Sequence, residues 1–108
     1  MTAYAVGCLR DVRMGDAIRT YLEGIDATLQ PFGGRFIIHG GTPEVREGSW
    51  PGHLVVIAFP AMASARAWYE SPAYRRILPL RTEYADCDVM LIDGVGHDHL
   101  ATDVLAEA

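Results

Sequence analysis

The segment LVVIAF at residues 54–59 is apolar at every position, and it constrains the fold more than any other part of the chain. Its length, its β-branched residues and the proline that follows it predict a β-strand. Successive side chains of a strand point to opposite faces, and an antiparallel sheet with one face in water alternates apolar and polar residues. This segment does not alternate, so both of its faces require burial.

The other strands and the first helix follow from shorter patterns. Further strands are predicted at residues 3–9, 35–39 and 89–92. Apolar residues at three- and four-residue spacings predict an amphipathic helix over residues 15–29. Asp11 or Asp16 is expected to cap its start. Pro31 and the glycine pair after it are expected to end it.

Two more helical segments are predicted between the last two strands. The first covers residues 61–70. Ser71 followed by Pro72 is typical of an N-cap and a first helical residue, so a new helix is expected to begin there. It should extend toward residue 85, with a bend near Pro79.

The resulting order is β-α-β-β-α-β, the α+β arrangement of the ferredoxin-like fold. Right-handed crossovers place the helices on one face of a four-stranded antiparallel sheet. The first and last strands are also apolar on both faces, so the face without helices would be an exposed apolar patch. We therefore predict a homodimer in which two copies pack sheet to sheet. Residues 1–94 would form this domain, and residues 95–108 a C-terminal tail.

Charge and composition exclude several classes of function. The 108-residue chain has a formal net charge of −5 and no basic stripe, which argues against nucleic acid and anionic membranes as partners. It contains no lysine, which excludes Schiff-base chemistry, pyridoxal phosphate attachment and the Walker phosphate loop. No segment is long and apolar enough to span a membrane and no signal-peptide pattern is present, so we expect a cytoplasmic protein.

Two cysteines, Cys8 and Cys87, are too few for a disulfide framework or a zinc site. They lie on strands that should be antiparallel neighbours, so the thiols are expected to be close together. In the cytoplasm they should remain reduced and behave as small apolar side chains.

Several separated runs occur in a fixed order between residues 31 and 81: PFGGRFIIHGG, EGSWPG, LVVIAFP, ARAWYESPAY and LR. Over roughly residues 3–94 the chain resembles the uncharacterised bacterial family called domain of unknown function 1330. The resemblance implies a dimeric α+β barrel, in which the sheets of two ferredoxin-like subunits close a barrel. It implies no single reaction, because proteins with this barrel include cofactor-free monooxygenases, isomerases, dehalogenating or haem-active enzymes and stress proteins. The family often has arginine at position 81, and it more often has arginine than histidine at position 39.

Arg35 and His39 are the candidate catalytic residues. Four positions apart on one strand, they are expected to point to the same face as Ile37. A histidine can act as a general base near neutral pH, and an arginine beside it can hold an anion. The structural alternative is that Arg35 lies in water and His39 bonds a loop carbonyl.

Aromatic residues supply the candidate substrate-binding set. Trp68, Tyr69 and Tyr74 could line a small-molecule pocket, with the tyrosine hydroxyls as polar contacts. Aromatic residues at helical spacing are also typical of an ordinary core. Trp50, beside Pro51, could simply hold its loop in place.

Arg81 is the remaining candidate binding residue. If buried it would need a carboxylate, and Glu83 and Asp86 are near in sequence, so a structural ion pair is the simpler interpretation. The tail residues resemble a set of ligands for zinc or nickel, namely His97, Asp98, His99 and Asp103. Their position near the terminus favours adventitious metal capture, so we predict no native metal site.

These observations support a homodimeric small-molecule-binding protein with one pocket per subunit between sheet and helices. If it is an enzyme, we expect cofactor-free acid–base chemistry on a small organic acid or aromatic metabolite. His39 would move the proton, Arg35 would hold the anion, and Tyr69 or Tyr74 would orient the substrate. The alternative is a non-catalytic binding or stress-associated dimer. Haem-linked chemistry would need an axial histidine facing a large cavity, for which only His39 and His53 lie on strands.

Overall fold

The computed structural model of the chain describes residues 1–106. The main elements in chain order are β1 (Ala3–Arg10), α1 (Asp16–Leu29), β2 (Arg35–His39), β3 (His53–Phe59), α2 (Met62–Glu70), α3 (Pro72–Thr82) and β4 (Asp86–Asp93). Two short 3-10 turns follow α1 and β4, namely η1 (Gln30–Phe32) and η2 (Ala101–Ala106). The predicted α+β, ferredoxin-like order is confirmed, and the helical segment between β3 and β4 is divided into α2 and α3.

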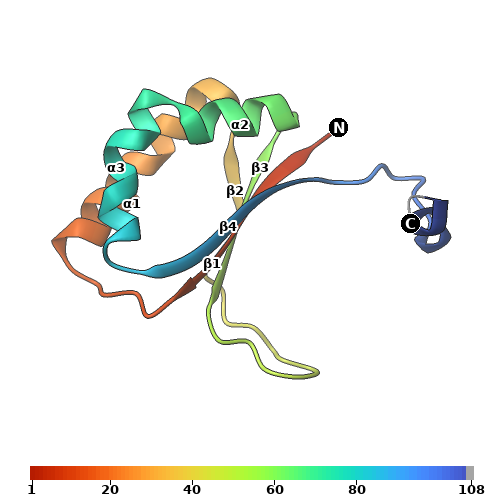
Figure 1. The fold of residues 1–108 in the computed structure, drawn as a ribbon, viewed down its shortest axis with the longest axis horizontal. Helices are drawn as coiled ribbons and strands as arrows, with labels where there is room; N and C mark the ends of the chain where they lie inside the picture. The colour runs from red at the N-terminus through yellow and green to blue at the C-terminus, as the bar shows by residue number, and fades with distance from the viewer. Residues whose placement is uncertain (107–108) are drawn as a thin grey trace.

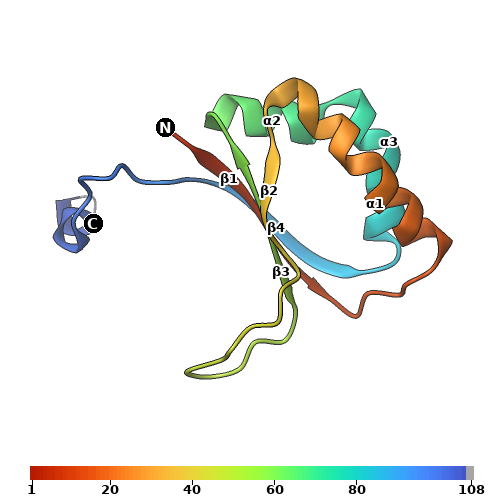
Figure 2. The same cartoon turned by 180° about the vertical axis from the view of Figure 1, so that it is seen from behind.

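The four strands form one antiparallel sheet in the order β2-β3-β1-β4. All three helices lie on one side of this sheet, as Figures 1 and 2 show from opposite directions. Cross-strand pairing sets the two faces. Ala5 is opposite both Ile57 and Leu91, and these side chains pack with the helices. Val6 is opposite both Val56 and Met90, and these point to the face without helices, called here the open face.

The open face is mostly apolar, as the sequence predicts. Its outer strands carry Ile38, Met90 and Ile92, which are substantially exposed in the single chain. No helix of residues 1–106 crosses this face (Figures 1 and 2). Both faces of the sheet therefore require burial, but the described chain covers only one.

An irregularity in β2 changes which of its side chains share a face. Phe36 is opposite Ile57, but Ile38 is opposite the next residue, Val56, so one extra residue is inserted between them. Such a β-bulge reverses the alternation beyond it. His39 consequently lies on the helix side with Phe36, and their rings stack with centroids 4.3 Å apart.

Arg35 precedes the bulge and is opposite Ala58, which places it on the open face. The expectation that Arg35 and His39 point to the same face is therefore wrong. A strict period of two holds only for a regular strand, and no residue type in the segment RFIIH signals the insertion.

The helix boundaries follow local signals in most places. Ser71 caps α3, because its hydroxyl accepts a hydrogen bond from the Tyr74 amide at 3.3 Å. Gly33 adopts a left-handed φ of 70° directly after η1, which ends the α1 region. The expected capping of α1 by Asp11 or Asp16 is wrong, since the N-cap is Gly15 and Asp16 lies in the first turn.

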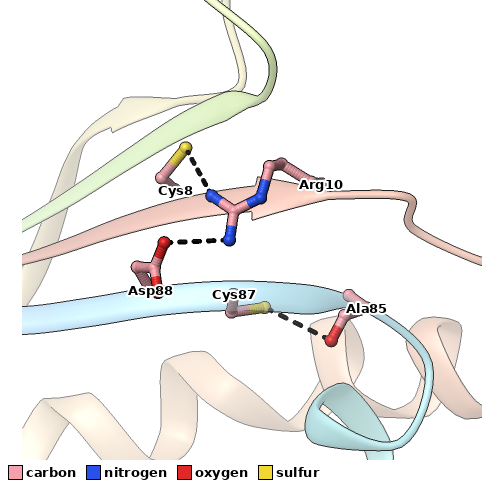
Figure 3. Close-up of polar contacts among 5 residues, drawn as sticks. All are labelled: Cys8, Arg10, Ala85, Cys87 and Asp88. Atoms are coloured by element: carbon pink, nitrogen blue, oxygen red, sulfur yellow. Dashed lines mark hydrogen bonds and ion pairs between the residues drawn. The ribbon is translucent and has the colours of Figure 1, made fainter.

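The two cysteines lie on opposite faces of the sheet. Cys8 is opposite Asp88 and points to the open face, whereas Cys87 is opposite Leu9 and points to the helix side. Figure 3 shows Cys8 accepting from Arg10 at 3.5 Å and Cys87 donating to the Ala85 carbonyl at 3.8 Å. Both thiols are free. The expectation that the two thiols lie close together is wrong. The strands are neighbours, but the two cysteines are not paired with each other, so their side chains point to opposite faces.

Beyond β4 the chain runs away from the sheet and ends in η2, in which no residue is buried (Figures 1 and 2). The last two residues of the predicted tail, 107 and 108, lie outside the described residues. Within the part that the structure describes, no helix has both the length and the apolar character needed to cross a membrane.

Candidate functional site

A cavity of about 90 Å³ lies between the helices and the sheet. Its walls come from α1, α2 and α3 on one side and from all four strands on the other. The lining residues are Ala5, Val6, Gly7, Leu9, Val12, Ile18, Tyr21, Leu22, Ile25, Phe36, His39, Val55, Ile57, Trp68, Tyr74, Arg81 and Val89. Most are apolar, and none is a carboxylate. Apolar walls with a few converging polar groups are typical of a small-molecule site.

Three polar groups meet at the helix side of this cavity. The hydroxyls of Tyr21 on α1 and Tyr74 on α3 are hydrogen-bonded at 2.7 Å. Arg81, about two turns beyond Tyr74 on α3, donates from its guanidinium to the Tyr74 hydroxyl at 3.4 Å. The guanidinium also lies 5.8 Å from the centre of the Tyr21 ring. We call Tyr21, Tyr74 and Arg81 the polar cluster.

Arg81 is buried without a carboxylate partner among residues 1–106. Its exposed fraction is 5%, yet in this part of the chain no carboxylate oxygen lies within 4.0 Å of its guanidinium nitrogens. The expected structural pairing with Glu83 or Asp86 is wrong. Arg81 lies in the last turn of α3, where the helix dipole favours a positive charge.

The surroundings set the protonation of the polar cluster. Burial lowers the pKa of Arg81, but the phenol oxygens of Tyr74 and Tyr21 outweigh it, so this pKa lies above its ordinary value. Burial raises the pKa of the Tyr21 phenol, and the neighbouring Tyr74 hydroxyl raises it further. At neutral pH the cavity therefore contains a fixed positive charge and a neutral Tyr21 hydroxyl that can donate a hydrogen bond.

The raised pKa of Tyr21 predicts a loss of stability at high pH. The unfolded chain releases this proton near the ordinary value of 10.0, whereas the folded chain retains it to higher pH. The contribution of neutral Tyr21 is thus complete below about pH 10 and is lost above it, by about 1.4 kcal/mol per pH unit. The free energy of unfolding, measured with urea at pH 9, 10 and 11, should fall less steeply with pH for Tyr21→Phe than for wild type. Tyr84 is exposed, so the unfolding free energy of Tyr84→Phe should fall with pH as that of wild type does. Equal slopes of free energy against pH for all three proteins would contradict this account.

Trp68 forms the aromatic wall next to the polar cluster. The centre of its ring lies 4.1 Å from the ring centre of Tyr74 and 5.4 Å from that of Phe59. Its indole nitrogen donates to the Thr28 hydroxyl at 3.0 Å, so its polar atom is satisfied without a ligand. Trp68 is therefore both a core residue and a cavity wall.

The other two aromatic candidates lie outside this cavity. Tyr69 packs against Trp68 and Tyr74 but lines a separate surface hollow together with Arg81, Thr82, Ala85, Asp86, Cys87 and Val89. Trp50 is exposed in the loop between β2 and β3, where it lines a different hollow with His53. Its predicted role in holding that loop is not tested by these contacts.

Among the described residues, His39 is the one histidine in the cavity lining. It is exposed to solvent, so it stands at the edge of the cavity and Phe36 stacks on it. Arg35, on the open face, cannot hold an anion for His39 in this cavity. The predicted pair is thus separated, and Arg81 is the guanidinium that the cavity contains.

The tail residues do not gather into a metal centre. His99 Nδ1 lies 3.8 Å from Asp103 Oδ2, and the two residues are four positions apart in the sequence. No group of three or more His, Cys, Asp or Glu side chains in residues 1–106 is placed to hold a metal ion. His53 does not line the cavity and instead borders the hollow beside Trp50. At about 10–15 Å³ for one water, the cavity volume suits a compound of about six to nine non-hydrogen atoms. That volume is too small for a haem.

Four of the six predicted site residues line the cavity: His39, Trp68, Tyr74 and Arg81. Sequence reasoning missed Tyr21 and Phe36. Tyr21 lies in the stripe of buried residues along α1, and the sequence signal for its role is its hydroxyl, which needs a hydrogen-bond partner when buried. Phe36 had no signal, because its position beside His39 depends on the β2 bulge.

The comparisons with known proteins agree with this architecture. The family model described as "Domain of unknown function (DUF1330)" matches residues 2–95. No curated protein matches the chain.

Several solved structures are similar in fold, including these three. The RPA0582 protein of unknown function from Rhodopseudomonas palustris is 16% identical, with 88% of this chain and 83% of that chain covered and a TM-score of 0.66. A dimeric ferredoxin-like protein of unknown function from Jannaschia sp. CCS1 is 12% identical, with 87% and 100% covered and a TM-score of 0.60. An antibiotic biosynthesis monooxygenase is 19% identical, with 89% and 100% covered and a TM-score of 0.50. At these identities the likeness establishes the ferredoxin-like fold alone.

Proposed function

The chain belongs to the DUF1330 family, and from that premise we propose that it is a homodimeric α+β barrel protein that binds a small molecule between sheet and helices. Each subunit would supply one site. The ligand would contact Trp68, Tyr74 and Arg81, with Tyr69 placed behind them at the surface hollow.

The observation that carries this proposal is the composition of the cavity. An ordinary core closes over its apolar side chains, and interiors contain few voids larger than a water molecule. This cavity is larger than that, and a buried arginine and two tyrosine hydroxyls converge on it. Burying a charge is costly unless a partner compensates it. An arrangement that leaves space beside such a charge is better explained by a ligand than by packing.

The homodimer is supported by the open face. Its apolar side chains from β1 and β3 are continuous with the exposed ones on β2 and β4. A soluble chain rarely leaves such a patch exposed. A second copy provides a surface of the same shape and chemistry, and the similar Jannaschia protein is a dimer.

Cofactor-free acid–base catalysis is the more specific form of the proposal. His39 at the edge of the cavity would move a proton to or from a ligand, and Arg81 would take the anion-holding role first given to Arg35. The similar antibiotic biosynthesis monooxygenase has the same fold, which by itself assigns no reaction. The alternative remains a non-catalytic binding protein that uses the same cavity.

Tryptophan fluorescence can test the binding site. The chain has two tryptophans, so Trp50→Phe leaves Trp68 as the only reporter, directly in the cavity wall. Compounds of six to nine non-hydrogen atoms, both neutral and anionic, should change its emission with saturation at one ligand per subunit. Native mass spectrometry should show a dimer. Emission unchanged by every compound in such a set would contradict the proposed site.

Catalysis and simple binding can be separated with His39→Ala. The protein would be incubated with a mixture of cellular small molecules, and compounds consumed or formed would be followed by mass spectrometry. A catalyst should convert a compound with wild type and with His97→Ala, an exposed control, but not with His39→Ala. A compound that binds all three proteins equally and is never converted would favour the non-catalytic alternative.

A further inference from the structure

We infer that the ligand of this cavity carries one negative charge, held by Arg81 and the tyrosine hydroxyls, on an apolar body of roughly ring size. The inference rests on the proposed function, because it names the chemical class of compound that the same cavity would bind.

The charge of the cavity supports a single anion. Its lining contains Arg81 as the one permanently charged side chain, with no aspartate or glutamate. His39 lies at the exposed edge of the cavity, away from the polar cluster on the helix side. A compound with one negative charge would balance Arg81. A neutral compound would leave the guanidinium uncompensated in an apolar environment.

The hydrogen bonds of Arg81 leave most of its donors available. A guanidinium presents five N–H donors in a planar fork that matches a carboxylate. Within residues 1–106, the Arg81 guanidinium donates one hydrogen bond to Tyr74, at the long distance of 3.4 Å, and the Tyr21 hydroxyl and the Cys87 thiol are its other polar neighbours. A carboxylate or enolate could accept from the remaining donors with stronger, charge-assisted geometry.

The tyrosine pair can contribute to the same anion. One proton forms the 2.7 Å hydrogen bond between the two hydroxyls, and the other hydroxyl proton remains free to point elsewhere. Because Arg81 donates to the oxygen of Tyr74, the proton of Tyr74 can go to Tyr21, whose own proton then serves the ligand. Tyr21 and Arg81 would contact the anion together.

The structure also contains the features that partly balance Arg81 without a ligand. The C-terminus of α3 contributes a partial negative charge of roughly half an elementary unit. Asp86 lines the surface hollow on which Arg81 also borders, but it lies beyond ion-pair distance. The partial charge and the distant carboxylate do not fully neutralise Arg81, so the site can still bind a ligand with one negative charge. Arg81 therefore borders both the cavity and this surface hollow.

The size and walls of the cavity define the rest of the ligand. Away from the polar cluster the lining is aliphatic or aromatic, with Ile18, Ile25 and Ile57 among its members and Phe36 at the far strand. The volume of about 90 Å³ suits about six to nine non-hydrogen atoms. Benzoate, a ring with one carboxylate, is therefore an appropriate probe, and benzamide is its neutral counterpart of nearly the same shape.

The test compares these two probes at pH 7 in the Trp50→Phe background, with Trp68 emission as the signal. We expect benzoate to bind at least tenfold more tightly than benzamide. Arg81→Gln should abolish this preference. Arg75→Gln should keep it, because Arg75 is an exposed arginine on the same helix that lies over the Tyr69 ring outside the cavity. Arg81→Lys should keep a reduced preference, since it retains the charge but not the planar fork.

Each other outcome has a defined meaning. Equal binding of both probes by the Trp50→Phe protein, or a preference that survives in Arg81→Gln, would overturn the charge inference and leave the cavity proposal intact. No change in Trp68 emission with either probe would overturn both. If circular dichroism shows that Arg81→Gln does not fold, the preference of the parent protein and its reduction in Arg81→Lys decide the question.

Discussion

Replacing Met90 with aspartate is expected to convert the dimer into a monomer while each chain keeps its fold. Met90 lies on β4 at the open face, opposite Val6, and is 54% exposed in the single chain. The fold of one chain therefore loses little when this side chain changes. In a sheet-to-sheet dimer the same position would be buried against the second copy.

The expected effect is large because symmetry doubles it. Loss of the remaining apolar burial costs about 1 kcal/mol per copy. A carboxylate forced into an apolar interface costs several kcal/mol more. A two-fold interface contains both changes twice, so the dimer dissociation constant should rise about a thousandfold or more.

Size-exclusion chromatography with light scattering over a range of concentrations measures this effect. Met14→Asp is the matched control, because Met14 is 71% exposed in the loop between β1 and α1, away from the open face. It should remain dimeric. A Met90→Asp protein that stays dimeric at micromolar concentration would show that the open face is not the dimer interface.

Replacing Trp68 with alanine is expected to cause a larger loss of stability than truncating any of the aromatic residues that contact it. Trp68 is 2% exposed and contacts the rings of Phe59, Tyr69 and Tyr74. Truncation of a buried tryptophan typically costs about 3–5 kcal/mol. It would also leave the buried Thr28 hydroxyl without its donor.

Urea unfolding followed by far-ultraviolet circular dichroism gives the free energy of unfolding without relying on tryptophan emission. Trp50→Ala provides the control, since Trp50 is 46% exposed in a loop and should change stability by less than about 0.5 kcal/mol. If both variants lose equal stability, or if Trp68→Ala loses less than 1 kcal/mol, Trp68 would not be part of the core as described.

Much of the fold could be predicted because local patterns and global requirements agree. The apolar run of β3 specifies a strand that is buried on both faces, and the stripe of α1 specifies its buried side. Ser71 and Pro72 carry the stereochemistry of a helix start within their own residues. Such signals depend only on residues that are near in the sequence, so they can be interpreted without the tertiary structure.

The candidate site was less predictable because it is assembled from side chains that are distant in sequence. Arg81 was expected to pair with a nearby carboxylate, but tertiary packing turned it toward Tyr74 and Tyr21 instead. Tyr21 and Tyr74 are separated by more than fifty residues and meet only because α1 packs on α3. Periodicity could assign both to a buried face but could not show that their hydroxyls form one cluster.

The sequence by itself determined the order of strands and helices, the two-faced apolar sheet and the absence of any lysine for covalent chemistry. Those properties depend on residue type and short-range spacing. Only the tertiary structure decided that a bulge turns His39 toward the helices while Arg35 stays on the open face. It also decided that Arg81 is buried beside a cavity without a carboxylate. Both depend on cross-strand register and on the packing of helices against the sheet, which no local pattern encodes.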